Sequence, residues 1–442
     1  MEMKERLSKE EIQKSFRSAF GSGFIREEDT AVMFHDLEFL EERIRRVIAA
    51  FPPTALHALA IKSNPLIRLM EFTRMISPQT GVEAASIGEV HLALHAGYDP
   101  ARILYDSPVK TADELAFALG TGVHVNADSL AELDRIAGLI AQGSGHGTIG
   151  IRINPQVGTG AIAESSVAGE YSKFGVPIKT KRRELLEAFR NFAWLTGVHL
   201  HVGSQGCHTG LLLNGIGVLY EFMEEVNADP GCQIPDAACL PARQGCRISQ
   251  FDIGGGFPIS YKSHETPPSI EDYADSIKLN YPSLLTAHCS LLTEFGRWIF
   301  TNAGWTATRV EYVKHDPGIS TAMIHTGADL FVRECLNPKD WQHEYSVLDR
   351  NGNLKTGKSR QPWNLAGPLC FSGDILATNL ILPEIAEGDY IVIHDTGGYT
   401  LSMWSRYNSR FTPRVVGYRG DEIAILKERE GIAELMKFWD QE

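Results

Sequence analysis

The sequence has no long hydrophobic run, little cysteine and no excess of positive charge. No apolar stretch approaches the ~18 residues that span a bilayer, so the sequence predicts no membrane anchor. Acidic residues outnumber basic ones by 55 to 42, a net charge of −13, which disfavours a nucleic-acid partner or an anionic membrane surface. The 43% apolar and 22% charged fractions are typical of a globular protein, which excludes disordered and collagen-like chains.

The seven cysteines are few for 442 residues and odd in number, which predicts free thiols rather than a disulfide framework. Cys232, Cys239 and Cys246 follow one another at seven-residue intervals, in a stretch from 227 to 247 whose Pro and Gly content predicts a surface insertion. A metal site needs closely paired ligands such as Cys-x2-Cys, and none occurs, so we expect no metal. The first twenty residues contain four glutamates and no apolar signal segment, so we predict a cytoplasmic protein.

Eight short β-rich runs alternate with amphipathic stretches of helical periodicity. The runs are HALAIKS from His57, VEAAS from Val82, ILYDS from Ile103, VHVNAD from Val123, IGIRINP from Ile149, VHLHVGS from Val198, SQFDIGGGF from Ser249 and LLTEFGR from Leu291. Two helical stretches, 111–118 and 129–140, have candidate N-caps at Asp113 and at Asp128 or Ser129. This alternation predicts parallel βαβ units. Eight such units close most simply into a (β/α)8 barrel, with an open doubly wound sheet as the alternative.

After about Trp298 the pattern changes to strand-like pieces that are separated by Gly, Pro and Asp turns. TATRVEYVKH, DYIVIHD and RVVGY follow without intervening helical stretches, which predicts a second, mainly β domain. The predicted fold is therefore α/β, a (β/α)8 barrel with a C-terminal mainly-β domain. We expect the barrel at residues 33–296 and the β domain at 297–442, with residues 1–32 packing on the β domain.

In a (β/α)8 barrel the chemistry lies at the carboxyl ends of the strands, so the polar residues there are the candidates. Lys62 ends the first run behind mostly apolar residues. A lysine so placed can act as a Schiff-base nucleophile toward a carbonyl cofactor, although an ordinary surface lysine fits the position too. The sixth run places His199 and His201 on one face. His201, nearer the carboxyl end, fits either a residue stacked on an aromatic cofactor or a hydrogen-bonded core histidine, and Ser204 offers a hydroxyl to a phosphate.

The last two runs end in a glycine loop and in an acid. The loop, 254–256, has no Cβ atoms, so its backbone N–H groups can approach a phosphate closely. Glu294 fits either a carboxylate that keeps a pyridine nitrogen protonated or a salt-bridge partner of Arg297. A lysine, a stacking histidine, a glycine loop and an acid, each at a predicted strand end, together describe a pyridoxal phosphate pocket.

Seven short segments, spread along most of the chain, match a known set of sequence signatures in their order and spacing. They are 60–65 (AIKSNP), 197–205 (GVHLHVGSQ), 252–258 (DIGGGFP), 294–297 (EFGR), 370–374 (CFSGD), 397–399 (GGY) and 407–410 (YNSR). They resemble the signatures of fold-type III pyridoxal-phosphate decarboxylases, and most closely those of diaminopimelate decarboxylases, from about residue 30 to 430. The resemblance implies pyridoxal 5'-phosphate as the cofactor. It also implies a head-to-tail homodimer whose two chains share their active sites.

The resemblance also implies a role for each matching residue. Lys62 would carry the cofactor as an internal aldimine, His201 would stack on its ring, and Glu294 would face the pyridine nitrogen. The remaining implied contacts are Ser204, Gly254, Gly255, Gly256 and Gly296 around the cofactor, Arg297 and Tyr399 at phosphate or substrate, and Phe371 and Asp374 at the substrate. Cys370, from the partner chain, would be the acid that returns a proton to the carbanion. Glu83 and the segment 173–175 (KFG) match with supporting roles.

Two positions depart from the family pattern where the far end of the substrate is held. A glutamate usually follows the family's cysteine, and Phe371 stands there instead. The arginine that follows the family's glycine-rich segment is also missing, because counting from 316–318 (DPG) reaches Ile324 or a neighbour. An unpaired buried charge costs several kcal/mol, so the doubly charged far end of diaminopimelate is disfavoured.

The sequence thus predicts a pyridoxal-phosphate-dependent decarboxylase of amino-acid metabolism, acting on an amino acid or amino-acid-like compound through aldimine and quinonoid intermediates. Diaminopimelate decarboxylation is the first alternative. An amino-acid racemase is the second, but such enzymes resemble this barrel with an arginine at the ring nitrogen, and Glu294 argues against it. The presence of Lys62 and Cys370 argues against a non-catalytic regulator.

Overall fold

The computed structural model describes residues 4–145, 147–232, 247–285, 289–357 and 359–440, which form two compact units. The barrel unit comprises Arg43–Ile259 and Pro268–Trp298, and the β unit comprises Met1–Glu42, Ser260–Pro267 and Ile299–Glu442. Part of the predicted insertion at 227–247, including Cys239 and Cys246, lies outside the described residues.

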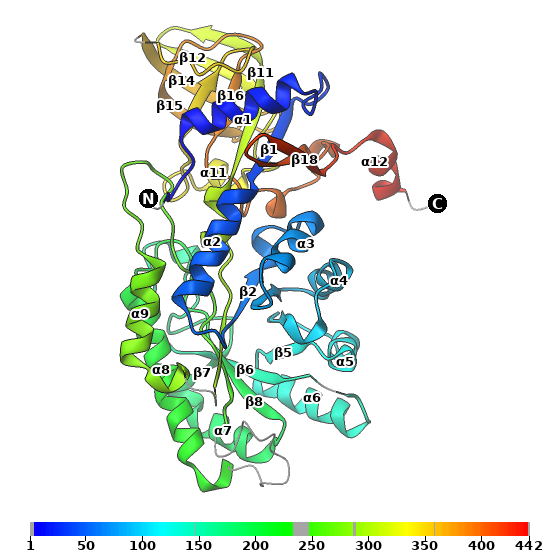
Figure 1. Ribbon diagram of the computed structural model, residues 1–442, viewed down its shortest axis with the longest axis vertical. Helices are drawn as coiled ribbons and strands as arrows, with labels where there is room; N and C mark the ends of the chain where they lie inside the picture. Colours follow the sequence, from blue (N-terminus) through cyan, green and yellow to red (C-terminus); the bar gives the residue numbers. More distant parts are fainter. Residues whose placement is uncertain (1–3, 146, 233–246, 286–288, 358, 441–442) are drawn as a thin grey trace. The chain divides into compact units, whose positions relative to one another are not determined.

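The barrel unit is built on a parallel sheet, some of whose strands are labelled in Figure 1. Its strands are β2 (Leu56–Ala60), β3 (Thr80–Ala84), β4 (Ile103–Tyr105), β5 (His124–Ala127), β6 (Ile149–Asn154), β8 (Leu195–His199), β9 (Gln250–Asp252) and β10 (Ser290–Thr293). The pairings of β2 with β10 and of β5 with β6 close the ring, and β7 (Val176–Pro177) adds a short strand beside β6. Each of the eight predicted runs forms one barrel strand. The predicted barrel is confirmed, and the open sheet is wrong.

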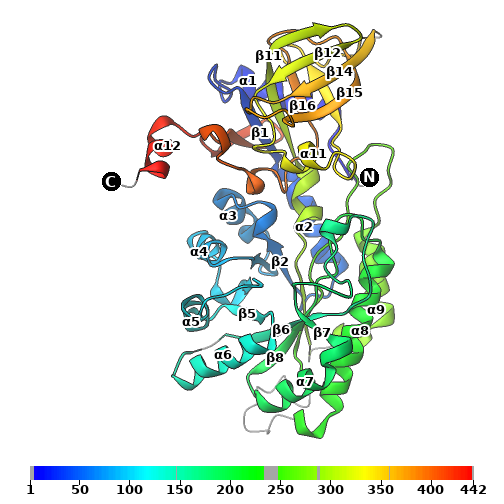
Figure 2. The ribbon, with the colours of Figure 1, turned by 180° about the vertical axis from the view of Figure 1, so that it is seen from behind.

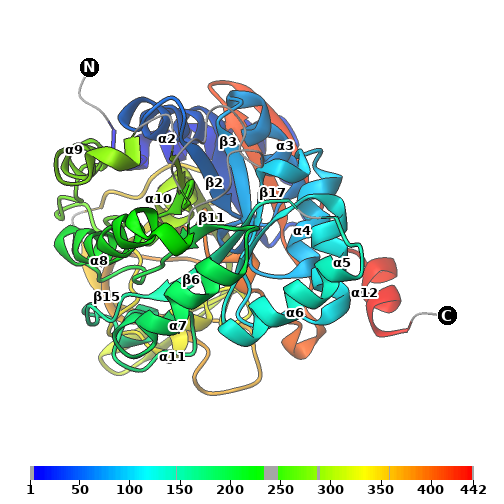
Figure 3. The ribbon, with the colours of Figure 1, turned by 90° about the horizontal axis from the view of Figure 1, so that it is seen from below.

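Helices follow the strands and surround them (Figure 3). They are α2 (Leu37–Ala50), α3 (Ile67–Ile76), α4 (Ile87–His95), α5 (Ala112–Thr121), α6 (Leu130–Ala141), α7 (Ile178–Asn191), α8 (Thr209–Ala228), α9 (Ile270–Asn280) and α10 (Arg297–Phe300). Ser129 caps α6, as expected, but the cap of α5 is Thr111, which forms a reciprocal capping box with Glu114. The expected cap Asp113 lies in the first turn instead. Within the described ranges, no helix is both long and apolar enough to cross a membrane.

The β unit is built on a second sheet, several of whose strands are labelled in Figure 2. Its strands are β1 (Ala31–Asp36), β11 (Gly304–Asp316), β12 (Ile319–Ile324), β13 (Tyr345–Leu348), β14 (Arg360–Ala366), β15 (Ile375–Pro383), β16 (Tyr390–Ile393), β17 (Arg414–Arg419) and β18 (Glu422–Lys427). The long β11 pairs antiparallel with β1, β12 and β16. The predicted mainly β character is confirmed, although one short helix, α11 (Val332–Leu336), interrupts the expected series of strands and another, α12 (Ile432–Trp439), follows it.

The N-terminal helix α1 (Lys9–Gly21) belongs to the core of the β unit. The ring of Phe16 is fully buried and lies 4.8 Å from that of Tyr390. Phe34, from β1, stacks on Trp305, from β11, with ring centroids 3.9 Å apart. Buried aromatic side chains of this size contribute much of a core's stability, so the N-terminal segment and the C-terminal strands fold as one structure.

Candidate active site

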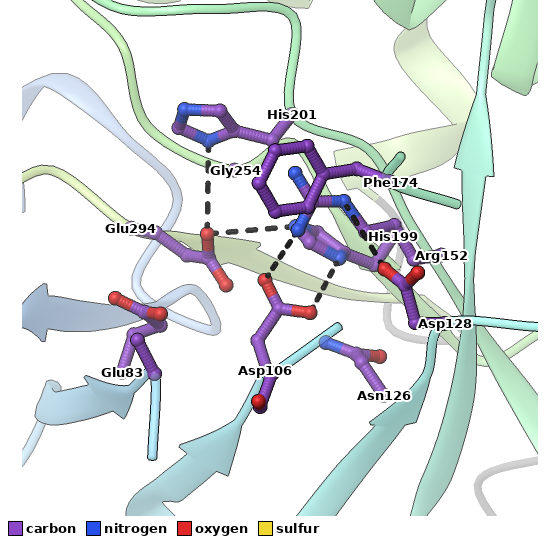
Figure 4. A network of polar contacts seen from close by, with 12 residues as sticks. Glu83, Asp106, Asn126, Asp128, Arg152, Phe174, His199, His201, Gly254 and Glu294 are labelled. Atoms are coloured by element: carbon purple, nitrogen blue, oxygen red, sulfur yellow. Dashed lines mark hydrogen bonds and ion pairs between the residues drawn. The ribbon is translucent and has the colours of Figure 1, made fainter. Parts of the chain in front are cut away.

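All eight strands of the barrel carry a polar side chain at their carboxyl ends, and several of these side chains converge (Figure 4). These are Lys62 after β2, Glu83 in β3, Asp106 after β4, Asp128 after β5, Arg152 in β6, His199 in β8, Asp252 in β9 and Glu294 after β10. No active-site role was predicted from the sequence for Asp106, Asp128, Arg152 or Asp252. The expectation that polar residues at the carboxyl ends of barrel strands are site candidates applies to them equally. The run ILYDS contains Asp106, and the run IGIRINP contains Arg152.

Lys62 lies in a short turn, Ile61–Ser63, directly after β2. Its Nζ is 2.7 Å from both carboxylate oxygens of Glu83, on the neighbouring strand β3. Burial raises the pKa of Glu83 to about 8, against the opposing effect of the Lys62 charge. The raised pKa makes the ionised Glu83 carboxylate a stronger base than an exposed glutamate, so it can accept the proton that the Lys62 amine must lose before it attacks a carbonyl group.

The glycine loop after β9 runs against two neighbouring backbone segments. A Cβ on Gly255 would lie 2.3 Å from the carbonyl oxygen of Glu294, and one on Gly256 would lie 1.9 Å from that of Gly203. Gly254 and Gly256 also have φ angles of +65° and +87°, in the left-handed region that side chains disfavour. Only glycine fits this path, which leaves the loop's backbone free of side chains, as in anion-binding loops.

His201 is held beside this loop as a neutral ring. Its Nδ1 accepts a hydrogen bond from the Gly255 N–H at 3.2 Å. Burial lowers the pKa of His201 to about 3, with further lowering by the charges of Lys62 and Arg152. The imidazole is therefore uncharged at neutral pH, and its partial exposure leaves a flat face available for stacking.

Glu294 carries a buried carboxylate without a hydrogen-bond partner. Neither of its oxygens has one among the described residues, although both are inaccessible to solvent. Its Oε2 lies 3.5 Å from Nε2 of His199 and 3.9 Å from Nδ1 of His201. Burial raises the pKa of Glu294, but the combined electrostatic effects of His199 and Lys62 outweigh this, so the net shift is downward. The carboxylate is thus ionised, and because an unsatisfied buried acceptor is costly, it is suited to receive a donor from a ligand.

A hydroxyl and a guanidinium lie on the remaining side of the glycine loop. Arg297, at the start of α10, is buried, and its Nε donates to Oγ of Ser204 at 3.2 Å. Ser204 in turn lies beside Gly256, whose added Cβ would be 3.7 Å from the Ser204 Cα. Gly296 is required by close packing, since a Cβ there would lie 2.9 Å from Oγ of Ser63. These groups together offer a cationic and hydrogen-bonding environment to an anion.

The residues at this end of the barrel fit pyridoxal 5'-phosphate. Lys62 supplies an amine for the aldehyde and His201 a flat neutral ring for stacking. Glu294 supplies a buried, unpartnered carboxylate for the ring nitrogen. The loop that a Cβ would obstruct, together with Ser204 and Arg297, supplies a cradle for the phosphate. The structure thus brings the candidate cofactor residues of the barrel together at one place.

The segment 173–175 supports this site from one side. The guanidinium of Arg152 lies 4.5 Å from the ring centroid of Phe174, as Figure 4 shows. Gly175, with a φ of +70°, approaches so closely that a Cβ would lie 3.0 Å from the backbone nitrogen of Asn154. The segment therefore packs over Arg152 rather than contributing a reactive group.

Three further candidates lie in the β unit, in the loop between β14 and β15. Cys370 is exposed, and its backbone N–H donates to Oδ1 of Asn408 at 2.9 Å. Phe371 is also exposed. Asp374 is buried, and its carboxylate accepts the backbone N–H groups of Ala328 and Leu369, both at 2.6 Å. The carboxylate of Asp374 therefore holds the loop itself, which does not support the expected contact with substrate.

Tyr399 lies in the β unit and contacts Arg333, for which the sequence predicted no role. Its backbone has a φ of +58°, a strained conformation of the kind that clusters at functional sites. Nη2 of Arg333, in α11, donates to the carbonyl oxygen of Tyr399 at 2.9 Å. Ile324, where counting from 316–318 placed the missing arginine, is instead buried in the core of the β unit. The arginine that contacts Tyr399 is therefore Arg333, and not a residue near position 324.

Comparison with known proteins places these observations in a family. Residues 37–301 match the family described as pyridoxal-dependent decarboxylase, pyridoxal binding domain. The chain is 31% identical over 387 residues to the diaminopimelate decarboxylase of Methanothermobacter thermautotrophicus, covering 86% of this chain and 83% of the relative. It is 29% identical to the Haemophilus influenzae diaminopimelate decarboxylase, covering 85% of each chain.

Solved structures show the same likeness. The diaminopimelate decarboxylase of Helicobacter pylori complexed with L-lysine matches with a TM-score of 0.81 at 26% identity, covering 95% of this chain and 99% of that one. The lysine/ornithine decarboxylase of Vibrio vulnificus complexed with putrescine matches with a TM-score of 0.74 at 21% identity, covering 93% of this chain and 99% of that one. The second likeness concerns the fold alone.

Proposed function

The chain belongs to the pyridoxal-dependent decarboxylases, and from this premise we propose which of its residues act in the reaction and which class of substrate they accept. The enzyme is a pyridoxal-phosphate-dependent carboxy-lyase that acts on an amino-acid-like substrate. The observation that carries the proposal is the convergence of Lys62, His201 and Glu294 at the carboxyl ends of the barrel strands.

Each barrel residue has one task in this proposal. Bound pyridoxal phosphate supplies an electron sink for the electron pair that remains when the substrate's carboxylate leaves as carbon dioxide. Lys62 holds the aldehyde carbon, and Glu83 takes the proton that the Lys62 amine must lose. The Glu294 carboxylate accepts a hydrogen bond from the ring nitrogen, and His201 supports the ring face. Ser204, Arg297 and the glycine loop bind the phosphate.

We propose that Cys370 returns the proton. Loss of carbon dioxide breaks a carbon–carbon bond and leaves an electron pair on the α-carbon, which the thiol proton of Cys370 then neutralises. The thiolate regains a proton from solvent, which its exposed position permits. We propose a homodimer in which the partner chain supplies this thiol, and the support for it is the family resemblance. We also propose that the enzyme is cytoplasmic.

The substrate class follows from the residue beside Cys370. A phenyl ring at Phe371 cannot pair with an ammonium group, so a substrate with a charged distal amine would bury that charge without a partner. We therefore propose an amino acid or amino-acid-like substrate whose distal end carries less charge than that of diaminopimelate. Diaminopimelate remains the alternative, because the two relatives compared above are named diaminopimelate decarboxylases.

The proposal is tested by the release of carbon dioxide. The purified protein is incubated with pyridoxal phosphate and a panel of D- and L-amino acids that includes meso-diaminopimelate. We expect release from at least one amino acid without a distal ammonium group, and slow release from diaminopimelate. A kcat/KM of about 10⁴ M⁻¹s⁻¹ or more on diaminopimelate would make the alternative the function. Racemisation without carbon dioxide release would identify a racemase.

Replacing Phe371 with glutamate should shift the preference toward diaminopimelate. The new carboxylate supplies the missing partner for the distal ammonium group, an effect of a few kcal/mol at a desolvated site, or more than about tenfold in discrimination. The ratio of kcat/KM on diaminopimelate to that on the native substrate measures the shift. Phe371→Gln is the matched control, because it has nearly the same shape without the charge, and an equal shift in both variants contradicts the proposed pairing.

A further inference from the structure

His199 lies between two acids in the interior of the barrel (Figure 4). It is the last residue of β8, and its side chain is fully buried. Nδ1 is 3.4 Å from Oδ1 of Asp106, and Nε2 is 3.5 Å from Oε2 of Glu294. One imidazole ring therefore connects an acid at the end of β4 to the acid at the end of β10.

This arrangement fits a protonated imidazole rather than a metal ion. The three side chains are close enough for a cation to be considered, with ligand atoms within 4.8 Å of one another. A metal, however, is bound through one imidazole nitrogen, whereas here the two acids face the two different nitrogens of His199. A protonated ring has an N–H donor at each nitrogen and can serve both acids.

The charges around His199 favour this state. Burial opposes the charged ring, but Asp106 and Glu294 raise the pKa of His199 well above its usual range. The pKa of Asp106 lies well below its usual range despite burial, because His199 and Arg152 are close. Nη1 of Arg152 is 3.4 Å from Oδ2 of Asp106, the carboxylate oxygen that does not face His199.

The other titratable groups that face His199 are neutral or more distant. Asp252, on β9, has a pKa raised well above its usual range by burial and by the charge of Glu294. His124, on β5, has a pKa lowered to about 4 by burial. The remaining groups of this cluster are His201, which is neutral, and the Lys62–Glu83 pair. The charged centre is thus the series Asp106, His199 and Glu294, with a net charge of −1.

We propose that His199 is a positioning residue that keeps the Glu294 carboxylate ionised toward the cofactor's ring nitrogen, and that Asp106 holds His199 in its protonated form. The inference rests on the proposed placement of Glu294 opposite that nitrogen. The Glu294 carboxylate and the ring nitrogen share a single proton, which can be bound to either group. A cation behind Glu294 stabilises the carboxylate, so the proton stays on the nitrogen, where it makes the ring a stronger electron sink.

The test compares the binding of two cofactors to the apoenzyme. The probes are pyridoxal phosphate and its 1-deaza analogue, in which a C–H group replaces the ring nitrogen, and calorimetry gives both dissociation constants. We define the nitrogen preference as the dissociation constant of the analogue divided by that of pyridoxal phosphate. His199→Gln should lower this preference about tenfold, the equivalent of one pKa unit on the Glu294 carboxyl. Asp106→Asn should lower it in the same direction by a smaller factor.

Two further variants separate the possible outcomes. His35→Gln is the matched control, because His35 is a buried histidine on strand β1 of the β unit whose pKa is lowered to about 4 by burial, and it should leave the preference unchanged. Glu294→Gln should lower the preference most. An unchanged preference in Glu294→Gln overturns the proposed placement of that acid.

If Glu294→Gln lowers the preference and His199→Gln weakens both cofactors equally, His199 has only a structural role and the inference fails alone. Should His199→Gln not fold, the nearly isosteric Asp106→Asn decides, and an unchanged preference in that variant overturns the inference.

Discussion

Decarboxylation by the Lys62→Ala variant should fall by at least about 10³-fold in kcat, because the substitution removes the only group proposed to form a covalent bond with the cofactor. The visible absorption of the bound cofactor should disappear as well. Both results are measured on purified protein, by carbon dioxide release and by a visible spectrum after gel filtration. Lys278→Ala, on the exposed surface of α9, is the control and should keep the activity and the spectrum of the unmodified enzyme.

A second measurement identifies the lysine directly. Borohydride reduction of the unmodified enzyme followed by peptide mapping should place the cofactor on the peptide that contains Lys62. If the absorption band survives in Lys62→Ala, or if the label maps to another lysine, the assignment is wrong. The Glu83 pairing would then have a structural role only, since its proposed task is to take the proton of this amine.

Mixing two inactive variants should restore activity if two chains share each site. Lys62→Ala lacks the covalent anchor and Cys370→Ala lacks the proton donor, but a hybrid dimer contains one site in which both residues are intact. Random exchange makes half of the dimers hybrid with one working site in two, so the mixture should recover about a quarter of the unmodified activity. Carbon dioxide release is measured before and after exchange.

The exchange itself needs an independent control. Chains that carry two different affinity tags show by co-purification whether hybrid dimers have formed. Activity that stays at the level of the separate variants, although hybrids are present, contradicts the shared site. The result would leave the barrel residues unaffected, because the grouping of Lys62, His201 and Glu294 lies within one unit of one chain.

The sequence was sufficient for the barrel because its signals are local. Each strand is a short apolar run, and each run ends in a polar residue, so alternation alone predicts eight βα units. The same rule applied to every run would have found Asp106 and Arg152. The carboxyl end of a parallel strand opens on the same side of the barrel whichever residue stands there.

The contacts between strands could not be read from the sequence. The bridge from Asp106 to Glu294 through His199 depends on which strands lie opposite one another after closure, and spacing along the chain does not contain this information. Arg333 was missed because a helix after the counted segment supplies the cation beside Tyr399. Asp374 matched a family motif, yet its carboxylate binds backbone N–H groups of its own unit, which only the structure shows.

The closing of the barrel between β2 and β10 has a consequence for how the chain folds. Nδ1 of His57 and Oγ1 of Thr293, which lie 2.9 Å apart across this seam, are separated by 236 residues in the sequence. A contact of such long range is slow to form, because closing so long a loop costs conformational entropy before the contact offsets it. Lys62 and Glu294 stand just beyond the two strands of this seam, so a binding pocket that needs both exists only once the ring has closed. A ligand that binds only the closed ring stabilises it by mass action, and the cellular concentration of that ligand would then set the fraction of molecules in which the ring is closed.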